Sequence, residues 1–441
     1  MERSDRRFEG IQGPLDMSHY SEAAYVERQR LSWIVLLASF SICMIFTVAV
    51  PVGVNAALQN MKLSLNTVAQ ANQGTVRVDN ARGESQVIIA GENGLPVAAG
   101  ARVLTDETST ASLLVYPPDL TENPLARLQI YSRSLVNLNE ASAPRFGLSD
   151  EAQKLELHLD NGRIQLTVLQ DEERPFAVSI NTPHGLVFVS HPGQYAVVVD
   201  NEETQISVQE GQADVLANSQ GKRLGSGQRA EIPANGDMVG PLTTDRNLIR
   251  NGDFYDSWAD WSLYVWNVEL SDQPEGTSEI VEVSGEPGVE FTREGTGHAD
   301  VRMRQVIGQD VTDYDALRLL LTFQITSHSL GVCGVQGSEC PLFVRLNYTD
   351  DRGVKRTWQH GFYSTGDVSP TTPDACVSCA VVQDTHQRVP LGQVSFYEAD
   401  LLEELARQGA PLPAFIEDVS LVASGHSFQV EILDVALMVE E

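Results

Sequence analysis

The chain has 441 residues, 42% of them hydrophobic, and its 60 acidic and 30 basic side chains give a formal net charge of −30. This length favours two domains, each with a full hydrophobic core. The acidic excess is dispersed, and the sequence lacks the clustered Lys and Arg that a phosphate-tracking groove requires, so nucleic acid is not expected as a partner.

Residues 31–54 form an apolar run with no charged side chain and predict a single transmembrane helix. A helix of these 24 residues rises about 36 Å, more than the ~30 Å thickness of the hydrocarbon core. Five arginines precede the run, whereas Lys62 is the only basic residue among the twenty that follow it. The positive-inside bias therefore predicts a single-pass protein of the cell membrane, with a cytoplasmic tail over 1–30, contact with the lipid bilayer over 31–54 and extracytoplasmic domains beyond.

The alternative for this segment is a cleaved signal peptide, because Val54, Asn55 and Ala56 resemble a small-x-small cleavage site behind a basic leader. The apolar run is longer than the roughly 7–15 residues of a signal h-region, which favours the membrane anchor. Residues 55–72 are polar and rich in Ala, Leu and Asn, and they predict a short stalk before the first domain.

Residues 73–240 predict an all-β domain, because no segment keeps a helical period and apolar residues recur at every second position. The clearest alternation runs through 155–159 and again through 164–168, on either side of Asn161-Gly162. Asn-Gly supplies the positive φ angles of a tight primed turn. This segment is therefore predicted to be a β-hairpin.

A second domain is predicted over 247–441, after a linker at 241–246. The stretch 233–246 lacks periodicity and is rich in turn formers. Four of the five Trp lie beyond it, and the strand pattern continues there. The whole extracytoplasmic part is therefore expected to be all-β.

One helix is predicted inside the second domain. Ser395 and Glu398 have the S-x-x-E spacing of a capping box, an apolar stripe follows over 401–405, and Gly409 is placed to end the helix. An isolated short helix is ordinary in a β-sandwich.

The four cysteines outside the apolar run predict two disulfides, because an oxidising compartment favours oxidation of an even set. The alternative is a four-thiolate zinc site, but the six-residue gap between the first two cysteines is wider than a usual zinc knuckle. Three pairings are open from the sequence. The four residues are Cys333, Cys340, Cys376 and Cys379.

The first β-domain resembles the FecR family of membrane-anchored β-domains in the order and spacing of seven segments. One departure is Gln194, where the family usually has Thr. In the best-known members a cytoplasmic tail regulates a sigma factor and the outer domain senses a transporter, but the tail over 1–30 is short and contains no Trp. The resemblance therefore implies envelope sensing or protein contact, with sigma-factor control as the alternative. The segments are GTVRV at 74–78, GLPVAAGARVLTDETSTASLLV at 94–115, LHLDNGRIQL at 157–166, NTPHG at 181–185, PGQYAVVV at 192–199, VQEGQADV at 208–215 and GSGQRAEI at 225–232.

The second domain resembles the galactose-binding or carbohydrate-binding-module jelly roll. It opens with NLIRNGDF at 247–254 and closes with IEDVSLVASGHSFQVEILDVALM at 416–438, a pair typical of that superfamily. Trp261 occupies the position of the family's structural Trp and is expected in the core. The resemblance implies a β-sandwich that binds a glycan or another envelope protein.

Three oxygen donors are candidates for a Ca²⁺ site in this jelly roll. The first and last strands of a jelly roll lie together, so Asn251, Asp253 and Asp434 could converge, and oxygen donors suit Ca²⁺. Relatives often place an acidic residue directly after the Phe, where this chain has Tyr255. Turn and cap roles are the alternative, and no other cofactor is expected.

Five aromatic residues are candidates for a glycan-binding face, because sugar rings expose C–H faces that stack on flat side chains. Core packing is the alternative for each of them, since large aromatic residues are usually buried. The candidates are Trp258, Tyr264, Trp266, Trp358 and Tyr363.

Catalysis is not expected, and no catalytic residue is assigned. The sequence contains no H-E-x-x-H, G-x-S-x-G or G-x-x-x-x-G-K-[ST] motif. The features together predict a non-enzymatic, membrane-anchored binding or sensing protein. The alternatives are a FecR-type transmembrane signalling regulator and a structural subunit of a membrane complex.

Overall fold

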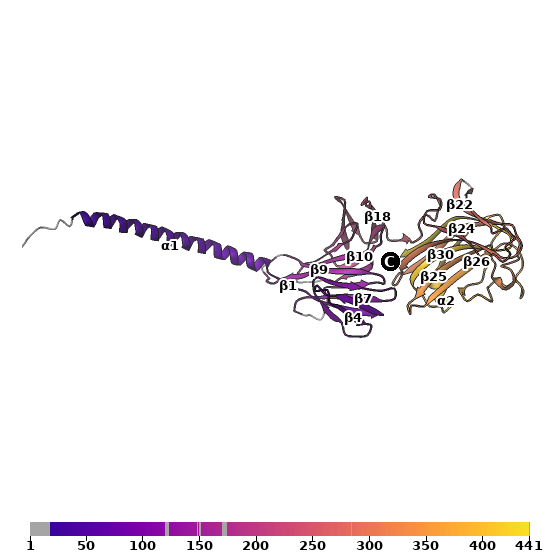
Figure 1. Cartoon of the computed structure of the whole chain (residues 1–441), viewed down its shortest axis with the longest axis horizontal. Helices are drawn as coiled ribbons and strands as arrows, with labels where there is room; N and C mark the ends of the chain where they lie inside the picture. Colours follow the sequence, from indigo (N-terminus) through magenta and orange to yellow (C-terminus); the bar gives the residue numbers. More distant parts are fainter. Residues whose placement is uncertain are drawn as a thin grey trace, which may run out of the picture. The chain divides into compact units, whose positions relative to one another are not determined.

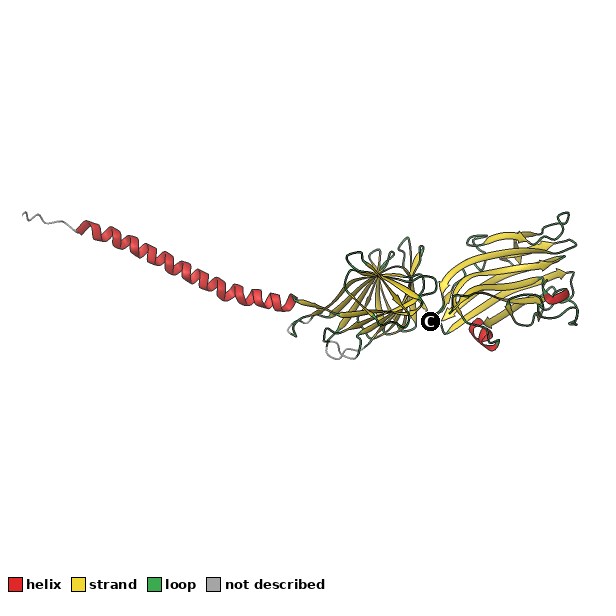
Figure 2. Cartoon of the chain, turned by 60° about the horizontal axis from the view of Figure 1, so that its bottom comes forward, coloured by secondary structure: helices red, strands yellow, loops and turns green. Residues whose placement is uncertain are grey.

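A computed structural model of the chain describes residues 18–119, 123–147, 149, 151–169, 174–283 and 285–440. It contains one long helix near the N-terminus and two regions built almost entirely of strands (Figures 1 and 2). The predicted all-β fold with a single N-terminal helix is therefore confirmed. Residues 1–17 of the predicted tail lie outside the described residues.

The N-terminal helix α1 (Ser18–Asn60) is longer than the apolar run that predicts it. Its segment Val26–Asn60 is long and apolar enough to cross a membrane, and none of the most apolar part is buried within the protein. The extension beyond 31–54 is expected physically, because the flanking residues include Glu, Arg, Gln and Ala, which are good helix formers. Large apolar side chains such as Trp33 and Phe40 are exposed along the helix.

The chain separates into two compact units. One contains the residues as far as Leu63 together with Pro144–Glu151, and the other contains Ser64–Ala143 and the chain from Ala152 onward. The second unit holds both β-domains, which are called here the first β-domain (64–243) and the sandwich (246–440).

The first β-domain has a barrel-like sheet in which pairs of consecutive strands, such as β13 with β14, alternate with pairs of strands further apart, such as β14 with β17. Its core consists of alternating Val, Leu, Ile and Ala side chains, such as Leu157, Ile164 and Val197. The strands in this part of the chain are β1 (Lys62–Ser64), β2 (Asn66–Gln73), β3 (Thr75–Asp79), β4 (Ser85–Ile89), β5 (Leu95–Val97), β6 (Ala101–Leu104), β7 (Thr110–Tyr116), β8 (Ala126–Ile130), β9 (Leu135–Pro144), β10 (Gln153–Val168), β11 (Phe176–Asn181), β12 (Leu186–Val189), β13 (Gly193–Val199), β14 (Glu203–Glu210), β15 (Gln212–Ala217), β16 (Gln220–Gly225), β17 (Gln228–Pro233) and β18 (Val239–Thr243).

The predicted hairpin at Asn161-Gly162 is wrong, because β10 is one continuous strand of 16 residues. Residues 153–158 pair in parallel with β11, whereas residues 162–168 pair antiparallel with β13 and β8. Gly162 has φ +98°, and a Cβ there would lie 2.2 Å from Oγ of Ser134. Gly162 therefore allows β10 to pass close to Ser134 and to change its partners from β11 to β13 and β8 without reversing direction.

The segment predicted as a stalk, 55–72, differs in the structure. Helix α1 continues to Asn60, and β2 pairs with β7 from Asn66 onward. Ala69 and Ala71 of β2 are buried in the first core, because small residues fit at these alternate positions. The predicted linker, 241–246, also differs. Its first three residues belong to strand β18, which pairs with β17.

The sandwich consists of two sheets that enclose a second core. One sheet has the order β21-β22-β31-β24-β29, with β19 added on β31, and the other has the order β20-β23-β30-β25-β26-β27, with β28 added on β26 (Figure 1). The pairing of β19 with β31 brings the start and the end of the domain together, as a jelly roll requires. The elements are β19 (Arg246–Asn247), β20 (Ser262–Trp266), β21 (Thr277–Val283), β22 (Glu286–Arg293), β23 (Ala299–Asp310), β24 (Ala316–His328), the 3-10 helix η1 (Val335–Gly337), β25 (Leu342–Asp350), β26 (Lys355–Tyr363), β27 (Val382–Gln383), β28 (Gln387–Arg388), β29 (Val394–Asp400), α2 (Leu401–Arg407), β30 (Pro413–Gly425) and β31 (Phe428–Glu440).

The short helix α2 begins later than predicted. Residues 394–400 form β29 and pair with β24, so Ser395 and Glu398 are strand residues and make no capping box. Asp400 is the N-cap, and its side chain accepts a hydrogen bond from the backbone N–H of Leu402. Leu401 and Leu405 are buried, as the apolar stripe predicts.

Both predicted disulfides are present. Cys333 is bonded to Cys340 and Cys376 to Cys379, which selects one of the three pairings that the sequence allows. Each bond closes a short loop of the sandwich.

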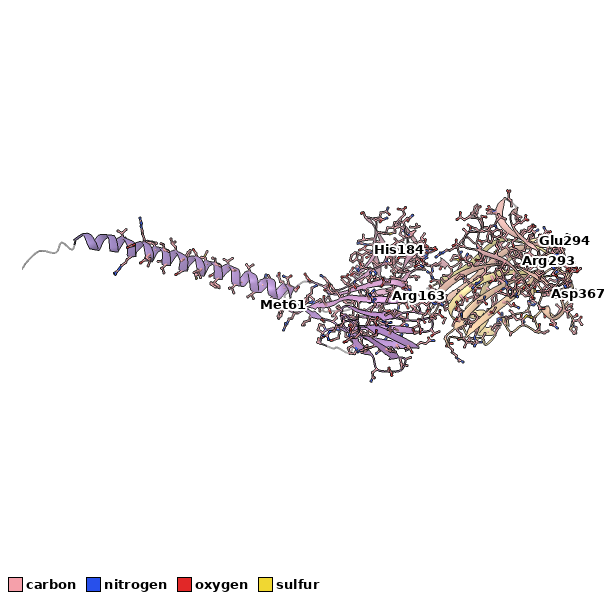
Figure 3. The ribbon with its side chains drawn as sticks, in the orientation of Figure 1. Met61, Arg163, His184, Arg293, Glu294 and Asp367 are labelled. Carbon is pink, nitrogen blue, oxygen red and sulfur yellow. A yellow bond between two sulfur atoms is a disulfide. The ribbon has the colours of Figure 1, made fainter. Side chains whose placement is uncertain are left out.

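Buried polar contacts join the first β-domain to the sandwich within their common unit. Arg163, labelled in Figure 3, is 2% exposed, and its guanidinium carbon lies 4.1 Å from the ring centroids of both Tyr131 and Tyr314. The carboxylate of Asp310 accepts hydrogen bonds from the backbone N–H and the hydroxyl of Ser132, at 2.9 and 2.6 Å. The first β-domain and the sandwich are thus connected by specific side-chain contacts as well as by the chain itself.

Candidate functional site

The outer face of the seven-stranded sheet of the sandwich carries a connected set of polar side chains. Side chains alternate between the core and this face, and the pairing register identifies the outer set. Trp358 points into the core and is fully buried, so its neighbours Thr357 and Gln359 belong to the outer face. We call the following set the polar face: Tyr264, Arg302, Arg304, Arg345, Asn347, Thr357, Gln359, Asp418 and Ser420.

One row of hydrogen-bonding side chains crosses the sheet from edge to edge. The register places one residue from each strand opposite its neighbour, and Nε2 of Gln359 donates to Oε1 of Gln383 at 3.1 Å. Gln359 and Ser420 are buried, whereas Ser262 is exposed and Arg304, Arg345 and Gln383 are partly exposed. A ligand that lies across the strands therefore has access to the donors and acceptors of these four residues. The row is Ser262, Arg304, Ser420, Arg345, Gln359 and Gln383.

Asp418 orients the part of the polar face formed by Arg304 and Asn347. Its carboxylate is buried and accepts from Nη2 of Arg304 at 2.7 Å and from Nδ2 of Asn347 at 2.7 Å. Oδ1 of Asn347 accepts in turn from the hydroxyl of Thr357 at 2.6 Å. These bonds hold the side chains in one arrangement before any ligand is present.

Tyr264 and Arg302 form the part of the polar face beside the edge strand β20. Nη1 of Arg302 donates to the hydroxyl of Tyr264 at 3.3 Å, and its guanidinium carbon lies 5.4 Å from the centroid of the tyrosine ring. Nη2 of Arg302 also lies 3.6 Å from Oδ2 of Asp300. Trp266, opposite Asp300 in the register, is 63% exposed.

Arg345 lies at the centre of the row. Its Nε donates to Oε1 of Gln359 at 3.0 Å, and its guanidinium carbon lies 5.2 Å from the ring centroid of Phe343. Burial and, after it, the nearby charge of Arg302 lower the pKa of Arg345. Among the described residues, no carboxylate lies within ion-pair distance of its guanidinium group.

A depression of about 350 Å³ adjoins the polar face. Four polar-face residues line it, and Lys355 and Glu417, at its rim, lie 3.8 Å apart as an ion pair. The polar-face residues that line it are Arg304, Asn347, Thr357 and Asp418.

The two disulfide loops border the polar face. Cys333 and Cys340 belong to a small apolar cluster with Phe343, Tyr363 and Val422, and this cluster covers one end of the outer face. At the β27 edge, the backbone carbonyl of Cys376 accepts from Nε2 of Gln383 at 2.6 Å. Both loops therefore help to shape the boundary of the face.

The structure places the five predicted aromatic residues in three different environments. Trp358 and Tyr363 are 0% and 5% exposed, so neither is available to stack on a ligand. Trp258 is partly buried against the second core. Only Tyr264 and Trp266, of the predicted set, lie at the polar face or its edge. Separately, Trp261 is buried as expected, and its indole N–H donates to the backbone carbonyl of Asn251 at 3.0 Å.

The three predicted metal ligands lie at the start and end of the sandwich. Nδ2 of Asn251 donates to the backbone carbonyls of Ser257 and Ala259, each at 3.0 Å, so this side chain orders a turn. Burial and, after it, the charge of Asp253 raise the pKa of Asp434. A Ca²⁺ site at these residues stays a prediction.

Among the described residues, one group of three His, Cys, Asp or Glu side chains has its potential ligand atoms within 4.8 Å of one another. It consists of Cys333, Cys340 and His386, and the two cysteines form a disulfide. A disulfide offers no thiolate to a metal, so this set does not constitute a metal centre.

Sequence reasoning did not identify most of the polar face, although a signal was present. In the strands, charged and amide residues alternate with apolar ones, as in VRMR at 301–304 and FVRLN at 343–347. Such a pattern predicts one core face and one polar face. Which polar residues share a face, however, depends on register between strands that lie far apart in the sequence.

Comparison with known families identifies part of the first β-domain. Residues 121–214 match the FecR protein family. The chain carries a FecR domain. This match confirms the resemblance that the sequence shows over part of 73–240, and comparison with curated proteins finds no match.

Solved structures show similarity to parts of this chain. A putative anti-sigma factor from Parabacteroides distasonis aligns with 31% of this chain at 18% identity and a TM-score of 0.24, and the chain spans 57% of that protein. A family 11 carbohydrate-binding module from Clostridium thermocellum, in complex with a β-1,3-1,4-mixed-linked tetrasaccharide, aligns with 44% of this chain and 94% of its own length at 10% identity and a TM-score of 0.26. TmCBM61, in complex with β-1,4-galactotriose, aligns with 44% of this chain and 99% of its own length at 11% identity and a TM-score of 0.24.

Proposed function

We propose that this chain is a non-enzymatic, membrane-anchored binding protein whose sandwich binds a glycan at the polar face. The observation that carries the proposal is the row of hydrogen-bonding side chains that crosses the sheet beside Tyr264 and Trp266. Sugar hydroxyls need many donors and acceptors, and sugar C–H faces stack on aromatic rings. The polar face offers both within one continuous surface.

The preorganised hydrogen bonds of the polar face support binding further. Asp418 fixes Arg304 and Asn347, so a ligand would not have to order these side chains on binding. The partly exposed Tyr264 is held by Arg302 in the same way. A rigid, polar surface of this kind suits a soluble, hydroxyl-rich ligand better than an apolar partner.

Anchoring is proposed through α1. The segment Val26–Asn60 satisfies the length and hydropathy of a membrane span, and its arginines lie on the N-terminal side of the apolar run. In this arrangement residues 1–30 lie in the cytoplasm, and the FecR domain and the sandwich lie outside it.

A second function, transmembrane signalling with sigma-factor control, is favoured by the FecR family match at 121–214. The FecR domain would then sense an envelope protein, and residues 1–30 would contact the cytoplasmic partner. A structural role in a membrane complex uses the same domains without a ligand. Specific binding of a sigma factor by the 1–30 peptide would favour the signalling function over both of the others.

The glycan proposal is tested with the full-length chain in lipid nanodiscs on a glycan array. We expect specific binding that is weakened, by up to about tenfold each, in Tyr264→Ala and Trp266→Ala, because an aromatic contact contributes about 0.5–1.5 kcal/mol. Tyr255→Ala is the matched control, because Tyr255 is 66% exposed and lies outside the polar face. Absence of binding by a protein with a native circular-dichroism spectrum would overturn the glycan proposal and leave protein partnership.

A further inference from the structure

The polar face carries one more positive than negative group. Three guanidinium groups lie on it, from Arg302, Arg304 and Arg345, and two carboxylates lie against them, from Asp300 and Asp418. The nearby Lys355 and Arg356 have their own partners, in Glu417 and Asp350. The excess charge is local, since the chain as a whole has a formal net charge of −30.

The excess charge belongs to Arg345. Arg304 lies 2.7 Å from Asp418 and Arg302 lies 3.6 Å from Asp300, whereas the guanidinium group of Arg345 contacts the neutral amide of Gln359. Arg345 is also partly buried, where a charge is screened less by water than at the surface. Burial and, after it, repulsion from Arg302 lower the pKa of Arg345, against the attraction of Asp300. An anion bound between or beside the two arginines would offset that repulsion.

We infer that the glycan of the polar face is acidic and that one of its sugar carboxylates pairs with Arg345. This inference rests on the proposed function of the polar face. The planar guanidinium group presents parallel N–H donors that match the two oxygens of a carboxylate. Nη1 and Nη2 of Arg345 are the atoms proposed for that pairing, since its hydrogen bond to Gln359 uses Nε.

A singly charged carboxylate fits this position better than a doubly charged phosphate monoester. One uncompensated positive charge is present, and Asp300 and Asp418 would repel any further negative charge. Sulfate and phosphate esters nevertheless share the oxyanion chemistry, so the test must separate them from carboxylates.

The ligand is an oligosaccharide and not a single sugar. Tyr264 lies on β20 and Arg345 on β25, and three strand-to-strand steps of about 4.8 Å separate these strands, a span of roughly 14 Å. A single sugar ring cannot stack at the aromatic edge and also place a carboxylate on Arg345. An acidic residue within a chain of two or more sugars can satisfy both contacts.

The inference is tested by titration calorimetry on the full-length chain in nanodiscs. The probes are oligogalacturonides, oligoglucuronides and alginate oligomers, each paired with its carboxyl-reduced neutral counterpart, together with sulfated and phosphorylated oligosaccharides. We expect at least one acidic oligomer to bind about 10- to 100-fold more tightly than its reduced counterpart, the factor that a hydrogen bond to a charged group provides.

Substitutions assign the preference to Arg345. Arg345→Gln should lower the affinity for the acidic oligomer to that of its reduced counterpart. Arg345→Lys should retain part of the preference, because it keeps the positive charge but loses the parallel N–H donors of the guanidinium group. Arg318→Gln is the matched control, since Arg318 lies on the opposite sheet and pairs with Asp245 and Glu440. The melting temperature of each variant confirms that it is folded.

The outcomes separate the inference from the function on which it rests. Equal affinity for acidic and reduced oligomers, or an acidic preference that survives in Arg345→Gln, would overturn the inference and leave glycan binding in place. Tighter binding of sulfated or phosphorylated probes than of carboxylated ones would overturn the carboxylate assignment. Binding of no probe, acidic or neutral, would overturn the proposed function as well.

Discussion

At the scale of single residues, His298 is held between two carboxylates. Its Nε2 lies 3.2 Å from Oδ1 of Asp300 and its Nδ1 lies 2.8 Å from Oε1 of Glu339. The hydrogen bonds with Asp300 and Glu339 raise the pKa of His298 to about 9, against the opposing effect of burial. Because Glu339 belongs to the Cys333–Cys340 loop, the charged histidine ties this loop to strand β23.

This pair of contacts predicts a pH-dependent stability. The pKa of His298 is higher in the folded chain than its ordinary value of 6.5, so its stabilising effect is complete below about pH 6.5 and disappears as the pH rises through about 9. His298→Gln should therefore lower the melting temperature of the sandwich at pH 6 by a few degrees, with little effect at pH 10. Tryptophan fluorescence reports this transition, because four of the five Trp lie in the sandwich.

The control for His298 is His191→Gln, which changes an exposed histidine bonded to Ser190 in the other β-domain. It should leave the sandwich transition unchanged at both pH values. A His298→Gln effect of the same size at pH 6 and pH 10 would show that the residue acts by packing and not through its charge.

At the scale of elements, the passage of β10 between two groups of strands depends on Gly162. A Cβ at this position would lie 2.5 Å from the Cα of Ser134, a backbone atom that cannot move independently. Gly162→Ala should thus destabilise the FecR domain by more than about 2 kcal/mol, through both the clash and the strained positive φ. Urea denaturation followed by circular dichroism measures this change.

A second glycine separates the two contributions to that cost. Gly227 also has positive φ, +73°, but a Cβ there would meet no atom within 4 Å. Gly227→Ala should cost only the backbone strain, about 1 kcal/mol. Equal costs for the two substitutions would contradict the close approach at Ser134.

The same strand illustrates what the sequence could predict. Alternation through 155–168 correctly identifies extended chain facing a core. The apolar positions change from odd numbers (155–159) to even numbers (164–168) across Asn161-Gly162, and this change of phase is equally compatible with a turn or a crossing. Local sequence contains no information on whether β10 meets β13 or folds back on itself. At residues 395–400 a helix cap and a strand are likewise both compatible with the pattern, and pairing with β24 decides in favour of the strand.

The candidate site was predictable in location and only partly in residues. The jelly-roll resemblance and the aromatic composition indicate the sandwich, and alternation shows that Trp358 faces away from Thr357 and Gln359. The sequence does not say which of these two faces is buried. In the structure, Trp358 belongs to the core between the two sheets of the sandwich. Arg345 and Asp418 lie together on the polar face because of the register between β25 and β30, which no local sequence pattern specifies.

At the scale of the whole molecule, the contacts of Arg163 couple the FecR domain to the sandwich. Besides its position against Tyr131 and Tyr314, its Nη1 donates to the backbone carbonyl of Thr312 at 2.6 Å. A buried charge with these partners is costly to remove, because the partners lose both a hydrogen bond and a cation–π contact. The two β-domains should therefore unfold together in the parent chain.

Arg163→Met tests this coupling, since it keeps an apolar stem and removes the charge and the hydrogen bonds. We expect calorimetry of the full-length chain to show one joint transition for the parent and two separated transitions for the variant, with the junction weakened by about 2–4 kcal/mol. Arg223→Met is the control, because Arg223 is an exposed residue of the first β-domain that pairs with Asp214. Two transitions in the parent chain would show that the domains are independent.

The expected coupling also predicts that a ligand bound to the sandwich stabilises the first β-domain. A ligand that binds only the folded sandwich stabilises every element that unfolds with it. Adding a bound oligosaccharide should thus raise the melting temperature of the FecR domain in the parent chain, although the polar face lies on the sandwich. In Arg163→Met the same ligand should raise only the sandwich transition, whereas a continued shift of both would mean that Arg163 is not the group that carries the coupling.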